Sequence, residues 1–304
     1  MSRRILFALA ALAAMPLTTS LCAADATTQF AAVVPFHDCN GMICFQAGID
    51  GGPPRTLALD TGNTASIMLT SAAKSMGWQS TPVLRDGKPL PGFQDGGQHV
   101  LTLGKTPLEV EFAVTGPASF GPAHLPAEGT LAYTAFKDRV LQIDYPHHLL
   151  RISAPVASGT VAAHSAGTLQ LIHFGHYGPP IVVGAPFTVD GHPVHAQIDT
   201  MYTGTMVVYD AALAGLDLHK QGTPKLFEFT DGGVEMLSST AHNLGFADRR
   251  LLGANPTVYF VGSGKNPVHQ PDGLFEATVG NPLFAHSVVT MDFHAMTLDV
   301  RPAG

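Results

Sequence analysis

Charged residues are scarce in this sequence, and positively charged residues are the scarcer kind. Aspartate and glutamate number 23 against 16 lysines and arginines, which gives a formal net charge of −7 and a charged fraction of only 13%. The basic residues are scattered, so the chain lacks the basic stripe that nucleic acid requires. The hydrophobic fraction of 45% predicts packed cores. We therefore expect a globular protein that does not bind nucleic acid.

Long apolar runs are also missing, apart from one near the N-terminus. There, Arg3 and Arg4 precede an apolar stretch at residues 5–15, and Ala24-Asp-Ala26 fits the A-x-A pattern of a cleavage site. About 11 apolar residues are too few for a membrane-spanning helix, which needs roughly 20. Residues 1–26 are therefore predicted to be a signal peptide, with no stable membrane insertion after cleavage. The mature protein would be periplasmic or secreted, by either the general or the twin-arginine route.

Cysteine is nearly absent, with three residues in all. Cys22 lies in the predicted signal peptide, which leaves Cys39 and Cys44 in the mature chain. An even number of cysteines in an oxidising compartment suggests one disulfide, and the Asn40-Gly41 pair between them favours a tight hairpin. The alternative is two unpaired thiols, and neither case implies a metal.

The motifs of several common enzyme classes are missing as well. The chain has no Gly-x-Ser-x-Gly elbow, no His-Glu-x-x-His pair and no glycine-rich phosphate loop with lysine. Serine hydrolase, zinc peptidase and nucleotide-binding functions therefore lose their usual support. The 15 histidines lie mostly at turns or in strand-like stretches, where we expect them to be structural or solvated. No metal and no cofactor is predicted.

Glycine and proline, in contrast, are abundant. The chain has 32 glycines and 23 prolines, and they separate short segments of alternating or apolar character. This pattern predicts an all-β fold with many turns. Only two short helices are expected, at residues 71–76 and 210–214, with Ser71 and Asp210 as their N-caps.

The sequence contains an internal repeat. Residues 59–69 align without a gap with residues 198–208, and residues 131–145 align with residues 279–293. Between these blocks each half carries an Asp-Gly-Gly triplet. Such a repeat predicts a duplicated domain, with the boundary in a stretch of little pattern near residues 154–167. The predicted domains are 27–157 and 158–304.

The repeat places one aspartate at the same point of each half. Asp60 lies between two apolar segments, where a lone carboxylate would be costly to bury. If the halves pack about a pseudo-twofold axis, Asp60 and Asp199 come face to face and share one proton. One carboxyl can then act as general base toward a bound water, and the other as general acid toward a carbonyl.

These motifs resemble those of the pepsin and retropepsin clan of aspartic peptidases, and most closely the bacterial exported, retropepsin-like proteins with two lobes in one chain. The resemblance is carried by Leu59-Asp-Thr-Gly62, by Ile198-Asp-Thr200 and by Thr278-Val-Gly280. It implies an all-β fold of two related β-barrel lobes with short helices and a cleft between the lobes.

The resemblance also implies roles for individual residues. Asp60 and Asp199 would be the catalytic pair, and Thr61 and Thr200 would brace the two loops through hydroxyl-to-backbone hydrogen bonds. The Asp-Gly-Gly triplets would form the turns of flap hairpins that close over an extended peptide. The other expected substrate-binding or supporting residues are Gly62, Thr64, Met201, Thr203, Gly96, Gly97, Gly232 and Gly233.

Two positions depart from the family pattern. Met201 stands where the second lobe would have glycine, and Ala132 replaces the later glycine of the first lobe. Glycine allows a close approach of backbone, so both changes bear on activity. The expected function is a monomeric aspartic endopeptidase that cleaves extended polypeptide. The alternatives are a catalytically impaired two-lobed peptide-binding or ligand-binding protein, and a homodimeric peptidase that pairs two copies of Asp60.

Overall fold

The computed structural model describes residues 29–85, 87–117, 125–156, 166–173, 180–209, 216, 221–229, 232–253, 255–261 and 275–303. Three predictions fall outside these residues, namely the signal peptide at 1–26, the domain boundary at 157/158 and the helix at 210–214.

The described chain is mostly β-strand, so the predicted all-β class is confirmed. The strands before residue 157 are β1 (Phe30–Cys39), β2 (Met42–Ile49), β3 (Arg55–Asp60), β4 (Ser66–Leu69), β5 (Thr81–Arg85), β6 (Lys88–Leu103), β7 (Thr106–Thr115), β8 (Gly129–Ala132), β9 (Val140–Asp144) and β10 (Leu149–Ser153).

The strands after residue 165 are β11 (Gly167–Ile172), β12 (Ile181–Val189), β13 (His192–Ile198), β14 (Met206–Val208), β15 (Gln221–Phe229), β16 (Gly232–Thr240), β17 (Leu244–Phe246), β18 (Arg249–Arg250), β19 (Thr257–Val261), β20 (Ala277–Val279), β21 (Ser287–Asp292) and β22 (Thr297–Pro302).

The two halves of the chain share one pattern of strand pairing. In the first half, β3 is parallel to β8, β8 is antiparallel to β4, and β4 is parallel to β7. In the second half, β13, β20, β14 and β19 pair in the same order and the same directions. A 3-10 helix follows β8 at Tyr133–Phe136 (η2), and another follows β20 at Asn281–Phe284 (η3). The repeat in the sequence is therefore also a repeat in topology.

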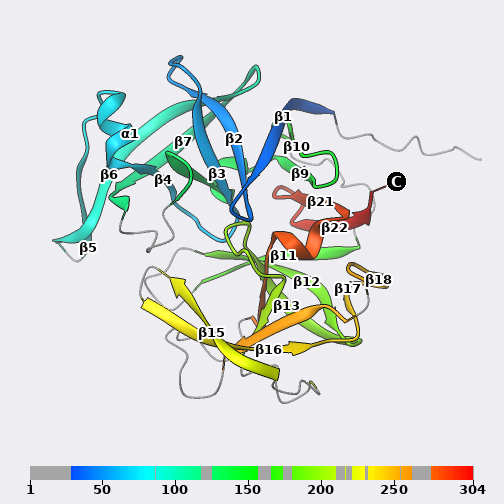
Figure 1. Ribbon diagram of the computed structural model, residues 1–304. Helices are drawn as coiled ribbons and strands as arrows, with labels where there is room; N and C mark the ends of the chain where they lie inside the picture. Colours follow the sequence, from blue (N-terminus) through cyan, green and yellow to red (C-terminus); the bar gives the residue numbers. More distant parts are fainter. Residues whose placement is uncertain are drawn as a thin grey trace, which may run out of the picture.

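A sheet built from both halves joins them. Its strands lie in the order β1, β10, β9, β21, β22 and β11, to the right of centre in Figure 1. At its centre β9 runs antiparallel to β21, and Gln142 pairs with Thr290, its counterpart in the sequence repeat. The side chains of these two residues form a hydrogen bond of 3.1 Å. This register relates the two central strands by an approximate twofold rotation.

Most strands around the two aspartates are buried. In the first half, the last four residues of β3 and all of β8 are buried, and in the second half β14 and β20 are buried at every residue. Strands buried on both faces read as continuous apolar runs rather than as alternating patterns. Strand β13, which leads to Asp199, instead alternates between buried and more exposed residues.

Helix α1 spans Thr70–Ser75, close to its predicted position. Its N-cap is Leu69, which has no side chain that could cap the first turn. The prediction of Ser71 as the N-cap was wrong, because the helix begins one residue before it. The buried side of the helix presents Ala72 and Ala73 to the core.

The prediction that the triplet at 95–97 forms a hairpin turn was also wrong. Gly96 and Gly97 lie inside β6, where the pairing with β7 shifts register between Asp95 and Gly97. Asp95 accepts the N–H of Gly97 at 2.8 Å, and Gly97 has a φ of +86°, so the triplet forms a β-bulge. The β5–β6 turn lies instead between Arg85 and Lys88. In the second half, Gly232 and Gly233 begin β16, which pairs with the end of β15.

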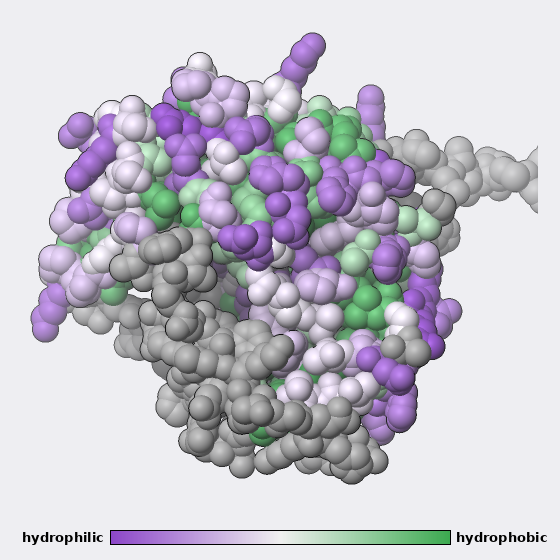
Figure 2. All heavy atoms as spheres, viewed as in Figure 1, coloured by the Kyte–Doolittle hydropathy of each residue, from purple (hydrophilic) through white to green (hydrophobic). Residues whose placement is uncertain are grey.

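The surface is mixed in character. On the face drawn in Figure 2, hydrophilic side chains predominate in the upper part, and hydrophobic ones form small separate patches. Among the described residues, no helix has the length and apolar composition needed to span a membrane.

Candidate active site

The two aspartates occupy equivalent positions in the fold. Asp60 is the last residue of β3, and Asp199 directly follows β13. Strand β3 is parallel to β8, with Asp60 opposite Ala132. Strand β13 is parallel to β20, with Ile198 opposite Val279. Both aspartates therefore stand at the carboxyl end of a parallel strand pair.

Reciprocal hydrogen bonds tie the two aspartate loops together. The N–H of Thr61 donates to the hydroxyl of Thr200 at 3.0 Å, and the N–H of Thr200 donates to the hydroxyl of Thr61 at 3.2 Å. The hydroxyl of Thr61 donates to the carbonyl of Ile198 at 2.8 Å, and that of Thr200 donates to the carbonyl of Leu59 at 2.6 Å. These are the hydroxyl-to-backbone hydrogen bonds that the resemblance implies. All four bonds are buried, so they hold residues 61 and 200 in direct contact.

The carboxylate of Asp199 lies against the backbone of the first loop. A methyl group added at Gly62 would fall 2.4 Å from Cγ of Asp199 and within 2.8 Å of both carboxylate oxygens. Atoms without a covalent bond do not approach so closely, so a side chain here would force the carboxylate of Asp199 to move. The glycine of the first loop thus leaves room for the aspartate of the second.

The two carboxyls influence each other's ionisation. Asp60 is only 7% exposed. Burial raises its pKa well above the ordinary value of 3.8, and the charge of Asp199 raises it further. Burial also raises the pKa of Asp199, while hydrogen bonds from the N–H groups of Met201 and Tyr202 lower it. Two such carboxyls hold a proton at a pH where isolated carboxyls have lost it.

Asn63 is a hydrogen-bond partner of Asp60 that the sequence motifs did not reveal. Its Oδ1 accepts the N–H groups of Thr64 at 2.8 Å and Ala65 at 3.2 Å, which leaves its amide nitrogen as the donor. The Asn63 side chain and the N–H groups of Gly62 and Asn63 act on Asp60 and lower its pKa in opposition to burial. An asparagine in a turn is common, so sequence alone did not reveal this role.

Met201 makes a backbone hydrogen bond to Asp199, as Gly62 does to Asp60. Its N–H donates to Oδ1 of Asp199 at 2.8 Å. Its side chain packs against a small apolar cluster of Cys44, Ala58 and Ala127. Space for the methionine therefore comes from small residues of the first half.

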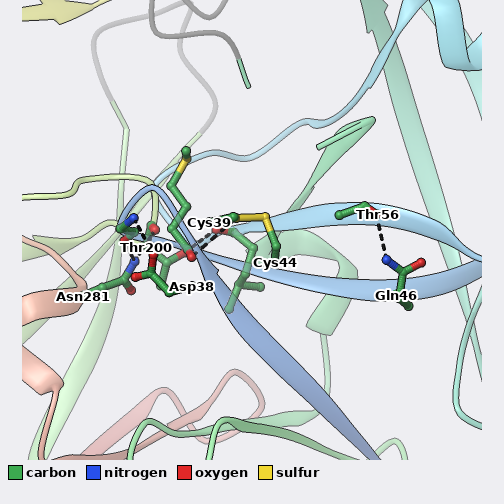
Figure 3. Close-up of a disulfide and its surroundings, with 10 residues drawn as sticks. Asp38, Cys39, Cys44, Gln46, Thr56, Thr200 and Asn281 are labelled. Carbon is green, nitrogen blue, oxygen red and sulfur yellow. Dashed lines mark hydrogen bonds between the residues drawn. A yellow bond between two sulfur atoms is a disulfide. The ribbon is translucent and has the colours of Figure 1, made fainter. Parts of the chain in front are cut away.

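The β1–β2 hairpin supports the second loop from outside. A disulfide joins Cys39 and Cys44 across the hairpin, with Cα atoms 5.9 Å apart. Figure 3 shows Thr200 and Asn281 beside this hairpin. The amide nitrogen of Asn281 donates to the carbonyls of Gly41 at 2.8 Å and Thr200 at 2.7 Å.

Asn281 is held in turn by Tyr145, whose hydroxyl donates to its Oδ1 at 2.9 Å. Sequence analysis did not single out either residue. The bond from Tyr145 joins residues 136 positions apart in the sequence, and the bond to Thr200 joins residues 81 positions apart. No local pattern in the sequence encodes such contacts.

The remaining predicted site residues are Thr64, Thr203, Gly96, Gly97, Gly232 and Gly233. The carbonyl of Thr64 accepts the hydroxyl of Thr134 at 2.8 Å, and Thr203 is exposed against Gly41. The space around Gly96 is filled by Val114, Phe112 and Trp78 rather than by either aspartate. Gly232 and Gly233 are described only as backbone in β16.

A hollow of about 1370 Å³ opens beside the first loop. Thr64 and Ala65 border it, and it continues past Tyr133 and the hairpin residue Leu84. Leu84 is 62% exposed. Neither aspartate lines this hollow, so it adjoins the first loop rather than containing the pair.

No group of three or more His, Cys, Asp or Glu side chains in the described part of the chain is arranged to hold a metal ion. Several histidines lie beside carboxylates instead, such as His147 at 2.8 Å from Asp144 and His195 at 3.4 Å from Glu276.

No protein-family model and no curated protein sequence matches this chain. Conclusions about its function therefore depend on the geometry of the paired loops.

Proposed function

We propose that this protein is an exported aspartic endopeptidase of the pepsin and retropepsin type, with two related lobes in one chain. Asp60 and Asp199 are its catalytic residues, and its substrate is polypeptide in an extended conformation. The enzyme needs no cofactor in this proposal.

One observation carries the proposal. Two Asp-Thr loops from equivalent points of the repeat are bonded to each other through the buried residues Thr61 and Thr200. A structural reason for placing the buried carboxyl of Asp60 beside a second carboxyl is hard to find, because each one raises the cost of ionising the other. Strongly perturbed titratable groups of this kind cluster at functional sites.

The chemistry follows from the shared proton. The ionised carboxyl removes a proton from a water molecule while that water attacks the carbonyl carbon of a peptide bond. The protonated carboxyl gives its proton to the carbonyl oxygen, which yields a neutral tetrahedral gem-diol. Collapse of the gem-diol breaks the C–N bond, returns one proton to the carboxyl pair and transfers another to the leaving amine. The pair ends with the single proton with which it began.

Space beside the first loop supports an extended substrate. The hollow that begins at Thr64 and Ala65 lies next to the Asp60 loop in sequence, and exposed Leu84 of β5 borders it. In this proposal, a polypeptide bound at the aspartate pair extends into the hollow by strand-like hydrogen bonding, with side chains contacting the hairpin.

The impaired-binder alternative depends on Met201 disrupting the site. The methionine keeps its N–H bond to Asp199, and its side chain packs against the cluster around Ala58. This accommodation supports a competent second loop. The bonds between Thr61 and Thr200 of the same chain likewise favour one active site per monomer over a pair of Asp60 residues from two chains.

Export is part of the same proposal. The disulfide between Cys39 and Cys44 suits an oxidising compartment such as the periplasm or the cell exterior. The N-terminal signal predicted from sequence would provide the route.

Cleavage of an unfolded polypeptide by the purified mature chain tests the proposal. We expect wild type to cleave, pepstatin to inhibit it, and Asp60→Asn and Asp199→Asn each to lower the rate by at least about 10³-fold. Circular dichroism of both variants checks that they remain folded.

The variants also separate the alternatives. Binding of pepstatin without cleavage by wild type would identify a binding protein. Full activity of Asp199→Asn in a chain that sediments as a dimer would identify Asp60 as the only catalytic residue.

A further inference from the structure

Gln197 connects the second half of the chain to the first aspartate loop. It lies on β13, two residues before Asp199, and is partly buried. Its amide nitrogen donates to the carbonyl of Gly62 at 3.0 Å. This hydrogen bond crosses between the halves at the loop on which the carboxylate of Asp199 rests.

The orientation of the Gln197 amide is set by its other partners. The hydroxyl of Thr278 donates to Oε1 of Gln197 at 3.2 Å, and the hydroxyl of Tyr209 lies 2.9 Å from that of Thr278. A threonine hydroxyl has one proton, so once Thr278 donates to Gln197 it can only accept from Tyr209. The chain of bonds therefore directs the NH₂ group of Gln197 toward Gly62.

The carbonyl that Gln197 holds belongs to the peptide between Gly62 and Asn63. The N–H of this same peptide faces Asp60: its nitrogen lies 3.5 Å from the main-chain carbonyl oxygen of Asp60, and it also lowers the pKa of the Asp60 carboxyl. A hydrogen bond to the carbonyl oxygen of a peptide polarises that peptide and makes its N–H a stronger donor. Gln197 can therefore act on Asp60 without touching it.

The first half has no equivalent of this contact. The residue two positions before Asp60 is Ala58, which is fully buried and whose methyl group cannot donate a hydrogen bond. Its surroundings include Met201 of the second loop instead. The two aspartates thus receive different support at equivalent positions.

We propose that Gln197 is a positioning residue for the catalytic pair, which fixes the Gly62–Asn63 peptide so that its N–H is held toward Asp60. Its effect on catalysis rests on the proposed peptidase function. Its effect on the first loop does not.

The test compares Gln197→Leu and Gln197→Ala with wild type and with a matched control, Gln46→Leu. Gln46 also donates to a residue on a neighbouring strand, Thr56, at 2.7 Å, but it is exposed and takes no part in the aspartate loops (Figure 3). Two measurements are made on each protein, namely carbon-13 NMR titration of the aspartate carboxyls and the pH profile of polypeptide cleavage. Loss of signals in Asp60→Asn and Asp199→Asn assigns the pair.

Both Gln197 variants are expected to raise the titration midpoint of Asp60 by about half a pH unit, because ionised Asp60 loses part of its support. The pH profile of kcat should move upward by the same amount, with KM changed little. Gln46→Leu should match wild type in both measurements. The charge of Asp199 acts on two neighbouring titratable groups, since it raises the pKa of Asp60 and that of Tyr202.

An Asp60 titration in the Gln197 variants identical to that of Gln46→Leu would overturn the proposal. The two proposals fail separately. If wild type does not cleave polypeptide, the peptidase function is lost, while the NMR titration still decides the role of Gln197.

Discussion

The two aspartate loops differ at the residue that follows the threonine, which is Gly62 in the first loop and Met201 in the second. At Gly62 the carboxylate of Asp199 lies against the backbone and excludes any side chain. Met201 retains the N–H that its aspartate needs, and its side chain turns to a cluster that includes Ala58. The comparison shows that the motif glycine is required by what packs against it, and not by the aspartate that precedes it.

The residues two positions before each aspartate, Ala58 and Gln197, also differ in size. Gln197 reaches the carbonyl of Gly62, which has no side chain of its own. Ala58 contributes to the cluster that receives Met201, and a larger residue would fill that space. Each pair therefore combines one small and one large residue, which preserves the packing volume where the two halves meet.

Adding a methyl group at Gly62 should have the largest effect on cleavage among changes that leave the aspartates intact. Gly62→Ala must displace the carboxylate of Asp199, since the new methyl would fall 2.4 Å from its Cγ. We expect cleavage to fall about 100-fold and the free energy of unfolding to fall by about 1–3 kcal/mol. Gly116→Ala is the matched control, because a methyl there meets no atom within 4 Å. Equal activity of the two variants would refute the close contact.

Breaking the brace between the loops should have the next largest effect. Thr61→Val or Thr200→Val removes a hydroxyl and leaves a buried N–H and a buried carbonyl without a partner, at a cost of about 2–3 kcal/mol each. The double variant should cost less than the sum, because the two residues share one network. Chemical denaturation measures all three. Thr56→Val, which loses an exposed bond, is the control, and strict additivity would argue against a shared network.

Removing one carboxyl should stabilise the protein above the pH at which isolated carboxyls ionise. Burial and the charge of Asp199 raise the pKa of Asp60 above 3.8, so the folded chain holds more protons than the unfolded chain and its stability falls as pH rises above that value. Asp60→Asn should therefore raise the free energy of unfolding at pH 7 by on the order of 1 kcal/mol. The gain should vanish below about pH 3.8. A difference that stays constant with pH would mean that Asp60 titrates normally.

Changing Met201 should have the smallest effect. Met201→Ala keeps the N–H that donates to Asp199 and loses only part of the packing against the Ala58 cluster. We expect a loss of about 0.5–1 kcal/mol in unfolding free energy and cleavage within about threefold of wild type. Thermal unfolding and initial rates measure these quantities. If this variant lost as much activity as Gly62→Ala, the contrast between the loops would be wrong.

Sequence reasoning predicted those features that are encoded locally. The abundance of glycine and proline indicated the all-β class, and Asn40-Gly41 indicated a tight hairpin, in which the two residues have φ of 60° and 83°. The alignment of the repeats also brought Asp60 and Asp199 forward as a pair. These patterns depend on neighbours in the chain, which a sequence displays directly.

Features that depend on distant contacts could not be predicted in this way. The resemblance assigned the triplet at 95–97 to a turn. Turns and bulges favour the same residues, and only the pairing with β7 distinguishes them. Asn281 and Gln197 gain their roles from partners in the other half of the chain. The departure at Met201 suggested damage, because its neighbours around Ala58 become adjacent only after folding.

The central claim is that Asp60 and Asp199 titrate as one coupled pair, and the carboxyl titration of Asp60 in the Asp199→Asn variant tests it most directly. Carbon-13 NMR should show that Asp60 loses its proton at a lower pH in this variant than in wild type, because the neighbouring charge that opposes its ionisation is gone. An Asp60 titration that does not move when the charge of Asp199 is removed would contradict the claim.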